Sequence, residues 1–240
     1  MELKGKTALV TGGTDGIGLE IARQMMARGA NVIVCGRRDD VLASARQEGL
    51  EAIKADLSNA AGCAELAAAL AGRELDILIN NAGMSGNFGP GEPLDLALTD
   101  QAIFLNLNAP LHLIGHLLPG LLKRPEASIV NVTSGLAIAP RAGGPVYCAT
   151  KAGLRSFTQS LRHNLRDTKV HVIEALPPVV DTAMTRGRVN GKKMSAKGCA
   201  AEIVDAIATN APEANVGMVK LLRLVYSISP ALAQRIMIRF

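Results

Sequence analysis

Short apolar runs alternate with longer helix-like segments between residues 7 and 173 of the chain. Runs that are apolar on both faces are typical of strands in a parallel sheet that helices cover on each side. The runs are Thr7–Val10, Asn31–Cys35, Ala52–Ala55, Ile77–Ile79, Ile129–Val132 and Val170–Ile173. The helix-like segments between them include Ile17–Arg28, Asp39–Glu48 and Ala60–Ala71.

This alternation predicts an α/β fold with a doubly wound parallel sheet and helices on both faces. A βα barrel would need eight units, whereas six or seven strands can be counted, so the open sheet is the better interpretation. The 240 residues, 48% of them hydrophobic, fit a single domain with one large core.

Composition narrows the partners and the compartment. The four cysteines are scattered and no secretory signal precedes the first strand, which favours a reducing cytoplasm. The chain has no run of about 18 apolar residues, so stable membrane insertion is not expected. Aromatic residues make up 2% and Trp is absent, so stacking platforms for nucleic acid are lacking. The net charge of +5 is compatible with anionic small molecules.

A glycine-rich stretch, TGGTDGIG at residues 11–18, follows the first apolar run. A strand-to-helix turn in a parallel sheet offers backbone N–H groups and a positive helix end to a phosphate. Such a turn can also use glycine for purely steric reasons. The stretch lacks the GK[ST] ending of a P-loop, which disfavours triphosphate hydrolysis. Its candidate cofactor contacts are Gly12, Thr14, Asp15, Gly16, Ile17 and Gly18.

The second strand ends in Gly36, Arg37 and Arg38, where an NAD-binding fold usually carries an acid for the ribose 2′-hydroxyl. A guanidinium matches the oxygens of a 2′-phosphate, so the sequence predicts NADP(H) rather than NAD(H). Two observations leave this open. The arginines could form a solvated loop edge, and Asp15 puts a negative charge near the phosphates.

Tyr147 and Lys151 are four residues apart, one turn from each other on a helix face. A tyrosine hydroxyl ordinarily titrates near pH ~10, and a nearby ammonium lowers that pKa toward the range useful to a general acid or base. A YxxxK pair alone is common on exposed helices.

The ordered set of TGGTDGIG, Asn80–Gly83, Ser134 and the Tyr147/Lys151 pair resembles the short-chain dehydrogenase/reductase family of single-domain type. The likeness runs from about Lys6 to Thr182. It implies a Rossmann-type domain and hydride transfer between a nicotinamide and a carbonyl/alcohol pair. The stretches 35–37, 147–151 and 160–163 look most like the DltE-type oxidoreductases.

The resemblance also implies roles for individual residues. Tyr147 would donate the proton in reduction, and Lys151 would hold the nicotinamide ribose and lower the pKa of Tyr147. Ser134 would hydrogen-bond the substrate oxygen. Asp56 would cap the adenine, and Thr182 would meet the carboxamide. The cofactor contacts beyond the glycine stretch and the arginines would be Asp56, Leu57, Asn81, Ala82, Gly83, Tyr147, Lys151, Pro177, Val180 and Thr182.

The family's fourth catalytic residue is an Asn, and Asn106 and Asn108 are the candidates. Family register favours Asn106. Pro110 supports it, because it lacks the N–H that would bond to the carbonyl of Asn106 in a regular helix. That carbonyl would be free for a water leading to Lys151. An ordinary proline kink is the alternative.

The chain departs from the family at Pro177-Pro178, where Pro-Gly is usual. The second proline fixes φ and removes one N–H donor, so we expect a stiffer loop and altered carboxamide binding.

Loops above the strand ends set specificity in such folds, and we expect Met84–Pro93, Leu136–Gly144 and Met184–Gly198 to do so here. Residues 184–198 are interpreted as a substrate lid. With Arg141, its basic residues could select an acidic substrate or an acyl-carrier partner, or they could form a mobile solvated lid. They are Arg186, Arg188, Lys192, Lys193 and Lys197.

The tail, residues 216–240, is apolar with sparse basic residues. We interpret it as an oligomer contact of a homodimer or homotetramer, split at Ser229-Pro230 into a strand-like part and a short helix. An interfacial membrane helix is the alternative. His112 and His116 have no obvious acidic or cysteine partner, so no metal site is predicted.

Together these features predict an NADP(H)-dependent oxidoreductase acting on a small-molecule carbonyl or alcohol. The rival is a catalytically silent NADP(H)-binding regulator or interaction subunit, which would need the glycine turn but not the proton donor. An isomerase or epimerase would usually bring a longer chain with a substrate domain.

Overall fold

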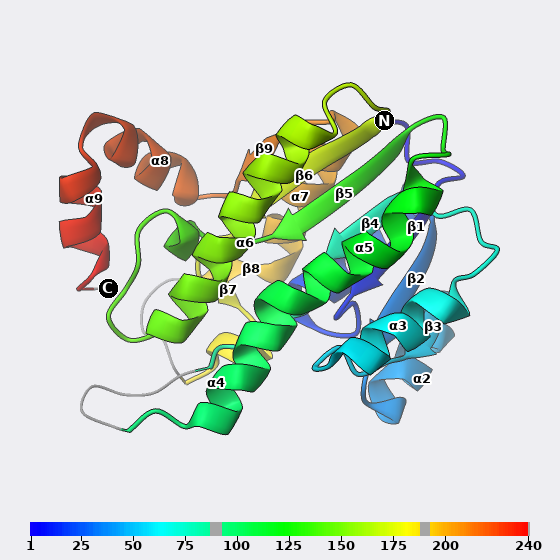
Figure 1. The fold of residues 1–240 in the computed structure, drawn as a ribbon, viewed down its shortest axis with the longest axis horizontal. Coiled ribbons are helices and arrows are strands. Elements are labelled where there is room, and N and C mark those ends of the chain that lie inside the picture. The colour runs from blue at the N-terminus through cyan, green and yellow to red at the C-terminus, as the bar shows by residue number, and fades with distance from the viewer. Residues whose placement is uncertain (87–92, 188–192, 240) are drawn as a thin grey trace.

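The computed structural model describes residues 1–86, 93–187 and 193–239. Its main sheet is open and parallel, in the order β3-β2-β1-β4-β5-β6-β9 (Figure 1). The strands are β1 (Thr7–Thr11), β2 (Asn31–Gly36), β3 (Glu51–Lys54), β4 (Ile77–Asn80), β5 (Ala127–Val132), β6 (Val170–Leu176) and β9 (Glu213–Asn215). This confirms the doubly wound α/β fold and excludes the barrel.

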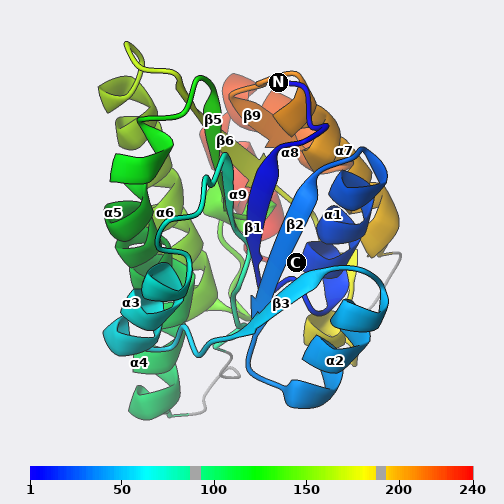
Figure 2. The same ribbon diagram turned by 90° about the vertical axis from the view of Figure 1, so that its right-hand side faces the viewer.

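Helices cover both faces of the sheet (Figure 2). One face carries α1 (Gly16–Ala27), α2 (Asp39–Gln47) and α7 (Ala196–Ala208). The other carries α3 (Ala60–Ala69), α4 (Leu96–Ile103), α5 (Ala109–Leu121) and α6 (Pro145–Asn164).

Each face has its own hydrophobic core. On β1, Ala8 and Val10 join the core beneath α1, α2 and α7, whereas Leu9 joins the core on the opposite face. Successive side chains of a strand point to opposite faces, so a strand buried on both sides must be apolar at nearly every position. All six residues of β5 are buried accordingly.

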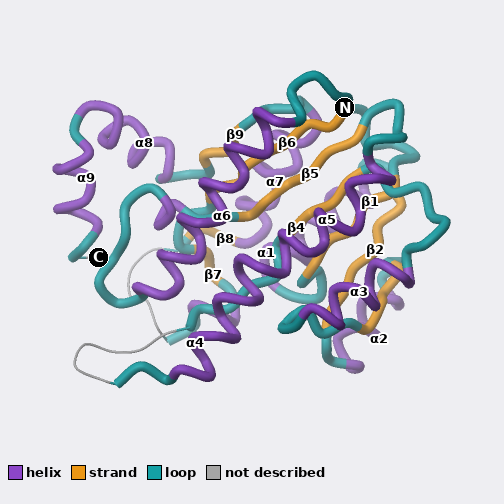
Figure 3. The backbone as a smooth tube through the Cα atoms, viewed as in Figure 1, coloured by secondary structure: helices purple, strands orange, loops and turns teal. Residues whose placement is uncertain are grey.

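After β9 the chain forms two further helices, α8 (Val219–Ile228) and α9 (Pro230–Met237). The expectation of a strand-like first part is therefore wrong. Ser229 does break the tail as predicted: its backbone is extended, and its Oγ accepts from the Leu232 N–H at 3.2 Å to cap α9. Both helices lie beyond the carboxyl ends of the central strands (Figure 3).

A small second sheet pairs β7 (Val180–Asp181) with β8 (Met194–Ser195). Within the described part of the chain, no helix is long and apolar enough to cross a membrane.

Candidate active site

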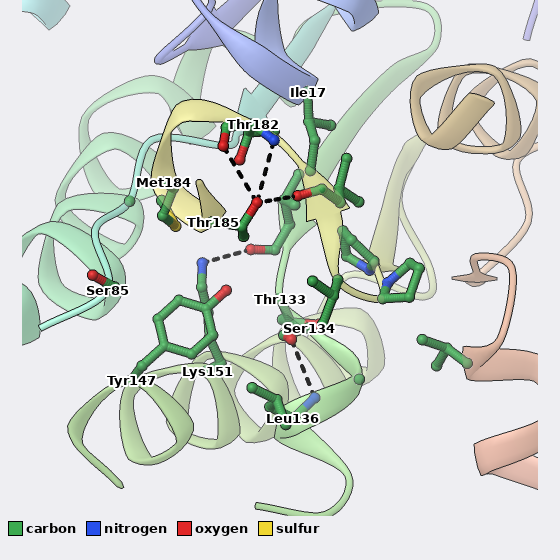
Figure 4. Close-up of a pocket in the computed structure, with 18 of the residues that line it drawn as sticks. Ile17, Ser85, Thr133, Ser134, Leu136, Tyr147, Lys151, Thr182, Met184 and Thr185 are labelled. Atoms are coloured by element: carbon green, nitrogen blue, oxygen red, sulfur yellow. Dashed lines mark hydrogen bonds between the residues drawn. The ribbon is translucent and has the colours of Figure 1, made fainter. Parts of the chain in front are cut away.

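A cavity of about 640 Å³ opens beyond the carboxyl ends of the central strands (Figure 4). Ligands of doubly wound folds bind at this edge, where the strand order reverses, here between β1 and β4. Four segments that directly follow strands contribute lining residues. They are the glycine turn after β1, residues 81–83 after β4, residues 132–136 at the end of β5 and residues 177–180 after β6.

The glycine turn is built so that side chains would not fit. Gly12 and Gly16 have φ of +60° and +55°, a left-handed conformation that favours glycine. A Cβ on Gly18 would lie 2.4 Å from the carbonyl oxygen of Gly12, and one on Gly12 would lie 2.9 Å from the Cα of Ala82. The turn therefore packs tightly against the segment after β4 and brings the N-terminus of α1 to the cavity.

Asp15 caps α1, since its Oδ1 accepts from the N–H of Gly16 at 2.7 Å. Asp15, Gly12, Gly16 and Ile17 line the cavity. Thr14 packs instead against the end of β2, where a Cβ on Gly36 would lie 2.8 Å from its Oγ1. The carboxylate that the sequence places near the phosphates is thus engaged in the helix cap.

The predicted 2′-phosphate and adenine residues lie at neighbouring strand ends. Arg37 follows β2 and Asp56 follows β3, and the two strands are joined by the Ala55 N–H bond to the Gly36 carbonyl. Arg37 is exposed and has no ion pair among the described residues, whereas Arg38 pairs with Asp40.

Asp56 is exposed, and its Oδ1 accepts from the Ser58 N–H at 3.0 Å. Leu57 beside it is buried. Neither residue lines the cavity, nor do Arg37 and Arg38.

Tyr147 and Lys151 rise from the first turns of α6 toward the same space (Figure 4). The Lys151 Nζ lies 5.8 Å from the centroid of the Tyr147 ring and donates to the Val132 carbonyl at 2.8 Å. Lys151 is only 4% exposed, and it forms no ion pair with the described residues. The predicted helical pair is therefore confirmed as a geometric fact.

The electrostatics differ from the sequence expectation. Burial raises the pKa of Tyr147 to about 12, and a hydrogen-bonding interaction with Ser134 only partly opposes it. Burial lowers the pKa of Lys151 to about 8. Burial of Tyr147 therefore opposes the lowering of its pKa that the sequence predicts from the neighbouring Lys151, and that role of Lys151 stays a prediction.

Ser134 stands at the end of β5 and caps the short 3₁₀ helix Gly135–Ala137. Its Oγ accepts from the Leu136 N–H at 3.1 Å, which leaves the hydroxyl hydrogen for another acceptor. The side chain faces the cavity near the Tyr147 ring (Figure 4).

The helix is irregular where Pro110 predicts an interruption: residues Phe104–Asn108 form a π-helix between α4 and α5. The fully buried Asn106 side chain accepts from the Met84 N–H and donates to the Met84 carbonyl, both at 2.8 Å. It also donates to Thr150 Oγ1 at 3.1 Å. Asn106 thus ties the segment after residues 81–83 to α6, and it does not line the cavity.

Asn81, Ala82 and Gly83 line the cavity, and their contact with a cofactor stays a prediction. The Asn81 Nδ2 donates to the Thr11 carbonyl at 2.9 Å, and Thr11 Oγ1 accepts from the N–H groups of Asn81 and Ala82. The sequence reading missed Thr11, although it immediately precedes the first glycine of the turn.

Pro177, Val180 and Thr182 also line the cavity. The Pro177 carbonyl accepts from the Gly135 N–H at 2.9 Å, so this loop is bonded to the segment that carries Ser134. Thr182 lies beside the glycine turn, since a Cβ on Gly16 would be 3.0 Å from its Cγ2.

The structure describes only part of the expected lid, residues 184–198, and of its basic residues. Arg188 and Lys192 lie outside the described residues. Arg186 is exposed and does not line the cavity, Lys193 donates to the Thr185 carbonyl, and Lys197 lies in the first turn of α7. Arg141 does line the cavity.

The tail forms a wall of the cavity, a position that the sequence reading did not assign to it. The lining residues are Met218, Val219, Leu221, Leu222 and Val225 at α8, and Ala233, Ile236 and Met237 on α9. The expected subunit contact of the tail stays a prediction.

Of the two histidines of α5, His112 packs against an aromatic ring and His116 is exposed. The ring of His112 lies 5.4 Å from that of Phe104. No group of three metal-ligating side chains occurs in the described ranges.

Comparison with known proteins shows the family to which this chain belongs. Residues 6–193 match the sequence profile of the short chain dehydrogenase family. An uncharacterized oxidoreductase of Bacillus subtilis, DltE, is 41% identical over 84% of this chain and 82% of its own length.

Solved structures share the fold. A short chain dehydrogenase from Burkholderia cenocepacia in complex with NADP superposes with a TM-score of 0.89 at 24% identity, covering 99% of both chains. A serine dehydrogenase complexed with NADP+ gives 0.78 at 29% identity, over 84% of this chain and 88% of that one. A Burkholderia phymatum protein in complex with NAD gives 0.82 at 23%, over 95% and 96%.

Proposed function

Since this chain belongs to the short-chain dehydrogenase/reductase family of oxidoreductases, we propose that it transfers hydride between NADP(H) and a small-molecule carbonyl/alcohol pair. One observation carries the proposal. Ser134, Tyr147 and Lys151 meet the glycine turn around a single cavity at the edge of the sheet where nucleotides bind.

The residues present fit a dinucleotide. The glycine turn leaves no room for side chains between the α1 N-terminus and the cavity, so a phosphate could approach its backbone closely. Arg37 follows β2, is exposed and has no ion pair among the described residues, which supports a role for its guanidinium in holding a 2′-phosphate. Of the three structural relatives described above, two are complexes with NADP and one with NAD, so the preference for NADP(H) rests on Arg37 and on the missing acid.

The bound nicotinamide supplies the hydride, and the chain's own residues handle the oxygen and the proton. The Ser134 hydroxyl, whose oxygen already accepts from the Leu136 N–H, donates its hydrogen to the carbonyl oxygen, which polarises the bond. Tyr147 then donates its proton to that oxygen. With a pKa of about 12 its hydroxyl is protonated at neutral pH, as a donor requires.

Lys151 stabilises the phenolate that Tyr147 leaves behind. Its pKa of about 8 keeps most of the side chain charged at neutral pH, and burial strengthens the attraction. Asn106 is a positioning residue: it joins the Met84 backbone to Thr150, the neighbour of Lys151.

The test is loss of NADPH absorbance with a panel of ketones, aldehydes and oxo acids. Tyr147→Phe removes only the hydroxyl and should lower kcat by ~10²-fold or more. Tyr226→Phe is the matched control, because Tyr226 packs at α8 and does not line the cavity. An unchanged kcat in Tyr147→Phe would refute the role of the tyrosine.

Tight NADPH binding without turnover of any compound would favour the silent regulator instead. The predicted cytoplasmic location and the homodimer or homotetramer remain predictions, and light scattering would measure the oligomeric state.

A further inference from the structure

Arg141 is the unexplained charge of the cavity. Among the described lining residues, the charged side chains are Asp15, Arg141 and Lys151. Asp15 caps α1 and Lys151 donates to the Val132 carbonyl. The Arg141 side chain has neither an ion pair nor a hydrogen bond in the described ranges, and its Nε is buried without a partner.

The structure holds this guanidinium between the catalytic tyrosine and the tail. Its Nε and Nη2 lie 3.4 and 3.7 Å from the position of a Cβ on Gly144, at the start of α6. Its charge is close enough to lower the pKa of Tyr147. The next residue, Ala142, donates its N–H to the Ile238 carbonyl at 3.2 Å, which fixes the loop to the end of α9 (Figure 1).

A guanidinium whose Nε is buried without a partner calls for an anion. Arginine keeps its charge at any physiological pH and carries donors only, so its unpaired Nε–H can be satisfied by an acceptor but not by deprotonation. A carboxylate matches the guanidinium fork with two parallel hydrogen bonds. No carboxylate of the described residues takes that place, since the only one lining the cavity is Asp15 in the glycine turn.

The tail wall has the opposite chemistry. Every lining side chain that α8 and α9 contribute is aliphatic or methionine. Leu221 lines the cavity and is still 53% exposed, and Ile236 is 50% exposed. A ligand with an alkyl chain would bind such a surface more tightly, by about fourfold in affinity for each methylene group that it buries there.

We propose that the substrate is an amphiphilic oxo or hydroxy acid, with its carboxylate on Arg141 and its alkyl chain along the α8–α9 wall. This rests on the proposed oxidoreductase function. The carbonyl carbon receives a hydride, with its two electrons, from the reduced nicotinamide, and the oxygen receives a proton from Tyr147. The products are the hydroxy acid and the oxidised nicotinamide.

Two measurements separate this proposal from the proposed function. The first compares kcat/KM for straight-chain 2-oxo and 3-oxo acids with that for methyl ketones of the same chain lengths. The second measures the thermal shift given by decanoate, an unreactive probe with the same charge and a comparable chain.

Arg141→Gln should lower kcat/KM for the acids by ~10-fold or more relative to its effect on the methyl ketones, since any effect of its charge on Tyr147 acts on both classes alike. It should also abolish the decanoate shift. Arg186→Gln is the control, because Arg186 is exposed and outside the cavity. Equal losses for acids and ketones would make Arg141 a structural residue and overturn the proposal.

The wall is tested by a matched pair on α8. Leu221 and Leu224 are 53% and 57% exposed, but only Leu221 lines the cavity. Leu221→Ser should reduce the gain in kcat/KM with each added methylene, and Leu224→Ser should not. Equal effects of both substitutions would overturn the assignment of the wall.

The outcomes are distinguishable. Turnover of ketones with no preference for acids would leave the oxidoreductase standing and refute the anionic substrate. An Arg141-dependent decanoate shift without turnover would support the anion site and count against the proposed function. A thermal shift with inorganic phosphate but none with decanoate would refute the assignment of Arg141 to a carboxylate.

Discussion

Lys151 should destabilise the fold at neutral pH, and the effect should depend on pH in a calculable way. The folded chain lowers the pKa of this lysine from 10.5 to about 8 because its ammonium is buried. A difference of one pKa unit corresponds to ~1.4 kcal/mol, so the charged form costs ~3 kcal/mol in the folded state.

The sign follows from proton linkage. Between the folded pKa of about 8 and the unfolded value of 10.5, the unfolded chain binds more protons. The contribution of Lys151 therefore makes the free energy of unfolding rise with pH in this window. Below the window, the full cost of burying the charged lysine is present.

Lys151→Met removes the charge and leaves the Val132 carbonyl without its 2.8 Å partner. The lost hydrogen bond costs ~1 kcal/mol at every pH. At neutral pH the variant should therefore be more stable than the wild type by ~2 kcal/mol, and above the unfolded pKa of lysine it should be less stable by ~1 kcal/mol.

The assay is urea unfolding of both proteins, without cofactor, at several pH values across this window. Taking the difference between the two proteins cancels groups that do not interact with Lys151, and Tyr147→Phe as a common background removes the titration of its neighbour Tyr147. Lys197→Met, at an exposed position on α7, is the control and should show a flat difference. A flat difference for Lys151→Met would refute the claim that burial sets the charge of Lys151.

Three further predictions follow from the geometry. Arg37→Asp should lower the ratio of kcat/KM with NADPH to kcat/KM with NADH by ~10-fold or more. Arg38→Asp should lower this ratio less, because Arg38 already pairs with an aspartate. Equal effects of the two substitutions would contradict the assignment of Arg37. Gly18→Ala should destabilise the apo-protein by ~1 kcal/mol or more and weaken NADPH binding, since the new Cβ would lie 2.4 Å from the Gly12 carbonyl oxygen. Gly115→Ala, where no atom lies within 4 Å of the new Cβ, should instead stabilise α5 by ~0.5 kcal/mol in the same thermal melts. The four cysteines are all buried, so a thiol reagent should label them only after unfolding, and rapid labelling of the native protein would show an error in the packing.

The main strands could be predicted from the sequence because burial on both faces leaves a continuous apolar run. β9 shows where this signal fails. Its three residues, Glu213–Asn215, include one buried residue, and the strand lies at the sheet edge, so it leaves no apolar run to detect. The first part of the tail carries a helical signal, since Val219, Leu222 and Val225 repeat every three residues, and the proline after Ser229 marks only where that helix ends.

The candidate catalytic residues could be predicted from the sequence because each lies at a fixed distance from a strand end or within one helix. Strand ends of a parallel sheet converge on one edge, so Ser134 after β5 and the turn after β1 meet without further information. Arg141 and the α8–α9 wall lack this property. Their position depends on how the tail folds back on the loop before α6, through contacts such as Ala142 to Ile238.

The pKa of Tyr147 marks a deeper limit of sequence reasoning. A neighbouring ammonium lowers the pKa of a phenol and burial raises it, and the spacing of Tyr147 and Lys151 fixes only the first effect. The second depends on β5, the 3₁₀ turn after it and α6 enclosing both groups, which no local pattern records. Here burial prevails and raises the pKa of Tyr147 to about 12. Oxidation of an alcohol needs the phenolate, so its kcat should rise with pH through the alkaline range, while reduction, which needs the protonated hydroxyl, should stay level through neutral pH. A pH profile of kcat in both directions measures this, and an oxidation rate that already levels off near neutral pH would show that attraction to Lys151 prevails in the working enzyme.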